Sequence, residues 1–290
     1  MFKQRALSSI GVVAVGVIPA LLGSPIFSIT IAIVAIGALY ELYRAFQRVG
    51  ARPSTWTGTA AVIALLVIAG TDAPFRALTG AMVGYTLISL GQHLFKKDIT
   101  GALLDWAFSL CGVMYVGVTL MHFILIRRIQ GDADTSWITK ADNLIGDGGA
   151  ALGLAWLLFA LFVTWLTDVA AYLVGRAIGR RKLIPTVSPG KTVEGAIAGL
   201  IGGSLTGAVA GSLLGVPHPL WLLAMIGAVL AVGAMVGDLG ESLIKRNIGI
   251  KDMGAIIPGH GGILDRIDAL LVTIPVTFYI AILLERTTWV

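Results

Sequence analysis

The sequence predicts an all-α polytopic membrane protein with about nine transmembrane helices. Of its 290 residues, 57% are hydrophobic and only 13% are charged, and the mean hydropathy is +0.89. A soluble domain has about 45–50% apolar and about 25% charged residues. This composition excludes a water-soluble enzyme and a nucleic-acid-binding protein. The single cysteine, Cys111, excludes a secreted disulfide scaffold.

Nine apolar stretches are candidates to cross a bilayer, which takes about 20 residues in a helix. They span roughly 6–23, 26–46, 55–71, 75–93, 101–126, 150–174, 193–214, 219–240 and 267–284. The first follows Lys3 and Arg5 and is followed at once by the second, so we expect a retained helix rather than a cleaved signal peptide. The third and fourth are short or rich in Gly and Thr, so the sequence marks their ends less sharply than those of the other stretches. The ninth directly follows a polar, glycine-rich segment.

The basic residues orient these helices. With nine spans, 16 of the 21 Lys and Arg residues fall on one side of the membrane. Because basic loops stay in the cytoplasm, this asymmetry predicts a cytoplasmic N-terminus and an external C-terminus. We divide the chain into an N-terminal region of about five spans and an outer loop (1–149) and a C-terminal region of about four spans (150–290). Most of the polar residues lie in the C-terminal half.

The outer loop, about 127–149, contains several aspartates and glycines. Their spacing does not fit an EF-hand, so we expect a solvated loop rather than a calcium site.

Carboxylates inside membrane segments are costly and mark candidate functional sites. Glu41 has Arg44 three residues later, which predicts an interfacial ion pair. Asp105 begins its span and is also expected at the interface. Asp168 differs, because it follows two threonines and leads into a basic loop.

The strongest local pattern is Asp238, Glu241, Ser242 and Lys245, whose spacing places them on one face of a helix. A simple Glu241–Lys245 salt bridge is the alternative interpretation. That alternative leaves Asp238 without a partner.

The segment that follows supplies charges and glycines suited to phosphates. It contains Lys245-Arg246, Lys251-Asp252, Pro258-Gly259-His260-Gly261-Gly262, Asp265-Arg266 and Asp268. Glycines let backbone N–H groups approach phosphate oxygens. Mg²⁺ typically takes one or two carboxylates and fills its other positions with phosphate oxygens and water. The pattern therefore predicts a nucleotide–metal site in which Asp238 and Asp265 bind Mg²⁺.

Ser188-Pro189-Gly190-Lys191-Thr192 opens the seventh span. Ser followed by Pro is typical of a helix start, so we expect a helix N-terminus that binds an anion. A P-loop is excluded, because Pro185 stands where the first glycine is needed.

These residues resemble the phosphatidate cytidylyltransferase (CDP-diacylglycerol synthase) family. The family signature is matched by Ser242, Lys245-Arg246, Lys251-Asp252, Pro258, His260-Gly261-Gly262, Asp265-Arg266 and Asp268. The upstream family elements are matched by Asp168 with Tyr172, Ser188-Pro189, Lys191-Thr192 and Glu194-Gly195. Val193 and Gly240 depart from it, where relatives often have Trp and Phe. The resemblance covers about 164–275.

The resemblance implies that CTP and phosphatidic acid react to give CDP-diacylglycerol and pyrophosphate, with region 150–290 catalytic. It implies Mg²⁺ and a second cation, either K⁺ or another Mg²⁺, which accounts for the surplus acids Glu241 and Asp268. It further implies a homodimer. The compact chain without long tails favours a bacterial cytoplasmic membrane, and the basic residues predict a site on its cytoplasmic side.

The resemblance also assigns residue roles. The phosphate clamp would comprise Lys245, Arg246, Lys251 and Arg266. Ser188 and Lys191 would hold a phosphate at the helix start, and Ser242, Gly261, Gly262 and Asp168 would contact substrate. His260 is expected either to donate to a phosphate or to shape the glycine-rich turn.

Two other functions stay open. One is a CTP-dependent lipid kinase, or another CTP-using transferase, acting on an isoprenoid or other membrane lipid; the kinase would release CDP. The other is an ion-coupled transporter, which would give flux without nucleotide and leave the basic segment without a role.

Overall fold

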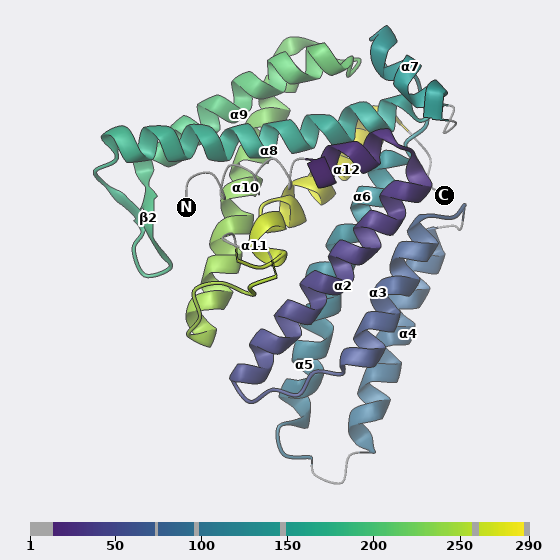
Figure 1. Ribbon diagram of the computed structural model, residues 1–290, viewed down its shortest axis with the longest axis vertical. Helices are drawn as coiled ribbons and strands as arrows, with labels where there is room; N and C mark the ends of the chain where they lie inside the picture. Colours follow the sequence, from purple (N-terminus) through teal and green to yellow (C-terminus); the bar gives the residue numbers. More distant parts are fainter. Residues whose placement is uncertain (1–13, 73–74, 96–98, 146–148, 257–260, 287–290) are drawn as a thin grey trace.

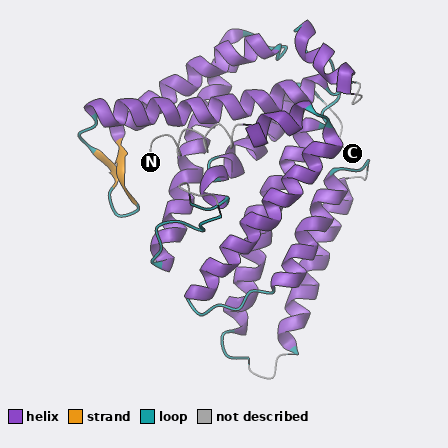
Figure 2. Cartoon of the chain, in the orientation of Figure 1, coloured by secondary structure: helices purple, strands orange, loops and turns teal. Residues whose placement is uncertain are grey.

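Helices form nearly all of the regular structure in the computed structural model, which describes residues 14–72, 75–95, 99–145, 149–256 and 261–286. One two-stranded hairpin extends from the end of the helical body (Figure 2). A helix over 14–21 comes first. The remaining helices are α2 (Ser24–Arg48), α3 (Thr55–Ala69), α4 (Phe75–Leu94), α5 (Ala102–Gly112), the π-helical turn η1 (Val113–Val118), α6 (Thr119–Arg127), α7 (Ser136–Ile145), α8 (Ala151–Ile178), α9 (Val193–Leu214), α10 (Leu220–Ile248), α11 (Leu264–Ile267) and α12 (Leu270–Leu284).

Five of these helices are long and apolar enough to cross a membrane: α2, the continuous α5–η1–α6 helix (Ala102–Arg127), α8, α9 and α10. Two shorter apolar helices, α3 and α12, have 15 residues each. In the described part of the chain, a helix overlaps each of the nine predicted stretches, and α2, α8 and α10 extend beyond theirs. The helical membrane fold is therefore supported, whereas the count of nine spans and the side of each terminus stay predictions.

Two groups of helices make up the body (Figure 1). Helices α2, α3, α4 and α5 run side by side, and α8 and α9 lie together across one end of them. Helix α12 packs against α6, α8 and α10, so it joins the two groups.

A glycine-lined face of α9 allows close packing with α8 and α10. Every fourth residue from Gly195 to Gly211 is a buried glycine. A Cβ at Gly207 would come within 2.9 Å of the Gly227 Cα on α10, and a Cβ at Gly199 within 3.2 Å of the Ala171 Cβ on α8. Small residues let helix backbones approach closely in membranes. This packing fixes α8, α9 and α10 relative to one another.

The predicted helix start at Ser188 is wrong. Ser188–Thr192 forms strand β2, which pairs antiparallel with β1 (Lys182–Ile184). Helix α9 begins at Val193, with the Thr192 side chain as its N-cap accepting from the Gly195 amide. Because the hairpin continues to Thr192, Lys191 lies on a strand beside the helix start.

The predicted solvated loop is also wrong in part. It contains α7, and Asp142 on that helix is buried. Its carboxylate accepts from Arg127 Nη2 at 3.1 Å and from the Ala150 amide at 3.0 Å, and Arg127 is buried too. A buried ion pair with added hydrogen bonds holds this connection against the ends of α6 and α8.

Candidate active site

Lys245 lies at the centre of a cluster of acidic side chains. Its Nζ donates to Glu241 Oε2 at 2.8 Å and to Asp265 Oδ1 at 2.7 Å. All three side chains are largely buried, and Glu241 is fully so. The predicted Glu241–Lys245 pair is thus present, but it extends to Asp265 on a different helix.

Asp265 also fixes the backbone of the glycine-rich turn. Its Oδ2 accepts from the amides of Gly262 at 2.7 Å and Met253 at 2.9 Å. Gly261 has a φ of 86°, a conformation that favours glycine. Burial alone would raise the pKa of Asp265, but the Lys245 hydrogen bond and the two amides outweigh burial and hold that pKa below its usual range. Asp265 is therefore ionised, and its carboxylate fixes the backbone of this turn by accepting from two amides.

Asp238 has a partner outside its own helix. The interpretation as a simple Glu241–Lys245 salt bridge would have left it unpaired. Its Oδ2 lies 2.6 Å from Lys191 Nζ, so strand β2 reaches over to α10. The Ser242 hydroxyl lies 3.5 Å from Asp238 Oδ1, one helical turn away. Both members of the Lys191–Asp238 pair are partly exposed, which makes this the accessible side of the cluster.

Two further acids complete the cluster. Asp268 is within electrostatic range of Glu241 and Asp238, and Asp168 on α8 is within electrostatic range of Asp238, Asp268 and Lys191. Glu241 Oε1 is buried and has no hydrogen-bond donor. Among the described residues, five carboxyl groups thus face two ammonium groups in this cluster.

The described residues contain no ready-made metal site, in the sense of three or more His, Cys, Asp or Glu side chains already gathered around one point. Lys191 and Lys245 instead contact Asp238, Glu241 and Asp265. Even so, a buried carboxylate oxygen without a donor, in an acid-rich cluster, fits a cation.

The other predicted site residues lie around this cluster. Arg246 donates from Nε to the Val187 carbonyl at 3.2 Å, so it joins α10 to the hairpin instead of the acids. Ser188 lies on that hairpin, Lys251 is exposed beyond α10, and Arg266 lies on α11. His260 falls outside the described residues.

The role of Glu41 could not be predicted from the residues around it in the sequence. Glu41 is buried on α2, and its Oε2 accepts from the Leu264 amide at 3.0 Å, across 223 positions of sequence. A Cβ added at Gly254 or Gly262 would overlap its carboxylate. The predicted Glu41–Arg44 ion pair is absent among the described residues. Glu41 instead anchors the turn that contains Asp265.

Tyr115 was missed as well. It lies in the π-helical turn η1, and its hydroxyl is buried without a hydrogen-bond partner in the described structure. The charges of Glu241, Asp268 and Asp238 act on it. Because π-helical turns are common at functional sites, Tyr115 is a candidate site residue from the N-terminal region.

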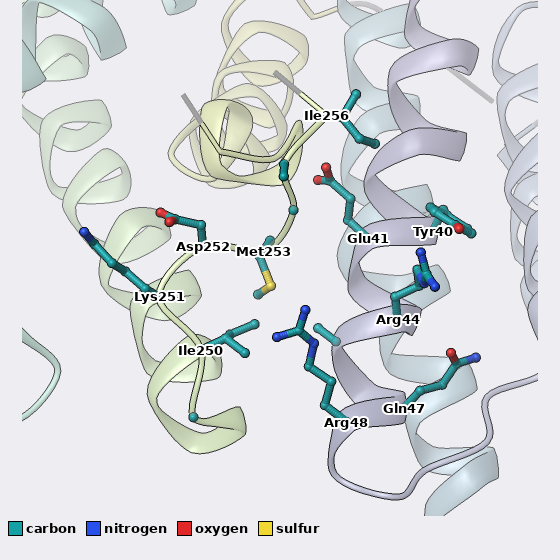
Figure 3. Close-up of a pocket in the computed structure, with 14 residues that line it drawn as sticks. Tyr40, Glu41, Arg44, Gln47, Arg48, Ile250, Lys251, Asp252, Met253 and Ile256 are labelled. Carbon is teal, nitrogen blue, oxygen red and sulfur yellow. The ribbon is translucent and has the colours of Figure 1, made fainter. Parts of the chain in front are cut away.

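A groove of about 880 Å³ borders the Asp265 turn (Figure 3). Residues 40–48 of α2 line one wall and residues 249–256 line the other. We call it the α2 groove. Met253, whose amide binds Asp265, belongs to its wall.

Comparison with known proteins agrees with the resemblance drawn from these residues. A sequence model of the cytidylyltransferase family matches residues 3–284. The phosphatidate cytidylyltransferase of Staphylococcus haemolyticus is 31% identical over 274 residues, which cover 94% of this chain and 96% of the relative. That of Staphylococcus saprophyticus is 36% identical over 199 residues, 69% of this chain and 65% of the relative. The chain belongs to the cytidylyltransferase family.

Proposed function

We propose that this protein transfers the cytidylyl group of CTP to phosphatidic acid. An oxygen of the lipid phosphomonoester attacks the α-phosphorus of CTP. The bond from that phosphorus to the β-phosphate oxygen breaks, and pyrophosphate leaves. The product is CDP-diacylglycerol.

The cluster of five carboxylates and two lysines is the observation that carries this proposal. Both substrates are anions, so the reaction needs positioning and charge neutralisation more than covalent catalysis. Lys191 and Lys245 supply positive charge from two different elements, β2 and α10. Lys245 contacts Glu241 and Asp265 on the buried side of the cluster, and Lys191 contacts Asp238 on its accessible side.

Magnesium fits this site. We propose that Asp238, Glu241 and Asp265 hold it, with Asp268 near a second cation, either K⁺ or another Mg²⁺. Glu241 supports this best, because its Oε1 is buried with no donor. When bound, the cation would neutralise phosphate charge during the displacement. Asp265 has less freedom, because Lys245 and two amides already engage its oxygens.

The remaining residues orient the substrates. The phosphomonoester is already ionised near neutral pH, so no general base is required. Gly261 and Gly262 let the backbone of this turn approach phosphate oxygens, although the Gly262 amide itself already donates to Asp265. Lys245 is held between Glu241 and Asp265. Positioning its ammonium group for the reaction therefore costs little further conformational entropy.

The deciding experiment measures the products from radiolabelled CTP and phosphatidic acid, with and without Mg²⁺. We expect labelled CDP-diacylglycerol and one pyrophosphate per turnover, dependent on the cation. Release of CDP with a phosphorylated lipid would overturn the proposal in favour of a CTP-dependent lipid kinase. Ion flux in vesicles without nucleotide would instead favour a transporter.

We also propose that the site faces the cytoplasm and that two copies associate. The first rests on the basic residues around the cluster, including the hairpin and the end of α10. Labelling of single cysteines introduced at the hairpin tip, in sealed vesicles, tests it. The dimer rests on the family resemblance alone.

A further inference from the structure

The α2 groove presents two arginines from one helix face. Arg44 and Arg48 are one turn apart on α2 and both line the groove. Figure 3 shows Arg48 pointing across it toward Ile250 and Met253. In the described residues, neither guanidinium lies within ion-pair distance of a carboxylate, and Arg44 lies 5.4 Å from the centre of the Tyr40 ring.

The acids of the groove do not neutralise these arginines. Glu41 accepts from the Leu264 amide at the inner end, and Asp252 points away from α2 in Figure 3, as does Lys251. Arg48 therefore points into the groove, and Arg44 lies at its edge beside Tyr40. An anion with several oxygen acceptors fits them, because guanidinium groups bind phosphate bidentately.

The face of α2 that carries Arg44 continues as an apolar stripe along the helix. Ile29, Ile33, Ile36 and Tyr40 follow one another on it, and Ile29 and Ile33 are 62% and 65% exposed. On a membrane-spanning helix such a stripe contacts acyl chains. A ligand with its phosphate at Arg44 and Arg48 and its chains along this stripe is a phospholipid; a nucleotide makes no use of the stripe.

The groove also leads to the candidate active site. Met253 lies in its wall and donates its amide to Asp265, and Glu41 closes its inner end against Leu264. A phosphate bound at the arginines thus lies beside the turn that Asp265 organises.

We propose that the α2 groove binds the phosphomonoester headgroup of the lipid substrate, an assignment that rests on the proposed function. A phosphomonoester carries about −1.5 to −2 charge at neutral pH, with three terminal oxygens. A phosphodiester lipid offers one charge and fewer free oxygens. Two guanidinium groups one helical turn apart on α2 therefore favour the monoester.

The test measures binding of fluorescent phosphatidic acid to the full chain in neutral detergent micelles, without nucleotide. Arg44→Gln and Arg48→Gln should each weaken binding about tenfold, the effect of losing a charge-assisted hydrogen bond. The matched control is Arg52→Gln, because Arg52 is exposed, lies four residues after Arg48 in the loop that follows α2, and does not line the groove. It removes the same charge and should leave binding unchanged. Phosphatidylglycerol should bind more weakly and depend less on the two arginines.

Unchanged binding in Arg44→Gln and Arg48→Gln would overturn the assignment, as would an equal loss in Arg52→Gln. Equal losses for phosphatidylglycerol would show a general anionic-lipid surface and also overturn it. Turnover separates this site from the proposed reaction: the two variants should raise the KM for phosphatidic acid and leave the KM for CTP unchanged. If the wild-type protein binds phosphatidic acid as described but yields no CDP-diacylglycerol, the proposed function is refuted, whereas the lipid site is still supported.

Discussion

Replacing Glu41 with alanine should detach the Asp265 turn from α2. The Glu41 carboxylate accepts from the Leu264 amide and lies against both Gly254 and Gly262. Alanine removes the acceptor, leaves a buried amide without a partner, and opens a space between the two glycines. The turn then loses its anchor on the N-terminal helices.

The structure sets the size of this effect. A buried hydrogen bond to a charged acceptor contributes about 1.5–3 kcal/mol, so the free energy of unfolding should fall by about that amount. A displacement of about 1 Å at a catalytic group costs about 100-fold in rate, so turnover should fall by roughly 10- to 100-fold. Glu41→Gln keeps an oxygen that can accept from Leu264 and should recover part of both losses.

Thermal unfolding in detergent and CTP-dependent turnover measure the two effects on the same samples. Glu285→Ala is the matched control. The Glu285 carboxylate accepts from Trp156 Nε1 at 3.1 Å and contacts His218 at 3.0 Å, at the far end of α12 from the turn. It should lower stability without lowering turnover of the folded protein. Wild-type turnover in Glu41→Ala, or an equal loss in Glu285→Ala, would refute the anchoring role.

Three perturbations test other parts of the structure, and one tests the topology. Asp238→Asn should lower turnover at least about 100-fold while the protein still inserts and folds; near-normal rates at saturating Mg²⁺ would refute the metal assignment. Gly207→Val should lower the free energy of unfolding by about 1–3 kcal/mol, because its side chain meets the α10 backbone, whereas Gly84→Ala, which meets nothing within 4 Å, should not. Because the pKa of Asp265 is lowered on folding, its stabilisation is complete above the unfolded pKa of about 3.9 and is lost as pH falls through the folded pKa. The stability difference between wild type and Asp265→Asn, from thermal unfolding at several pH values, should therefore shrink below about pH 4; a constant difference contradicts this. Asp134→Asn, on the predicted outer side, should leave activity intact, and a large loss would mean that the topology is inverted.

Local sequence patterns predicted much of the candidate site. The spacing of Asp238, Glu241 and Lys245 places them on one helix face, and the structure has them there. The chemistry of the following segment predicted that Asp265 pairs with Asp238; in the structure Lys245 joins Asp265 to this helix face, whereas Asp238 pairs with Lys191. Hydropathy predicted a helix in each apolar stretch, because membrane burial imposes one composition on all of them.

Long-range contacts could not be predicted in this way. The partner of Glu41 is the backbone amide of Leu264, so no pattern near Glu41 indicates it. Local rules favoured Arg44 instead, three residues away. Ser188-Pro189 resembles a helix start, but pairing between β1 and β2 carries the strand on to Thr192. In both cases tertiary contacts override a sound local preference.

The two lysine–carboxylate pairs have a thermodynamic consequence for substrate binding. In the resting protein each ammonium group is already satisfied, so a triphosphate must compete with Asp238 or Asp265 for it. Drawing a lysine away leaves a carboxylate uncompensated, which is costly unless a cation arrives at the same time. On the proposed function, nucleotide and divalent ion therefore bind with positive heterotropic cooperativity, and each tightens the other by the same factor.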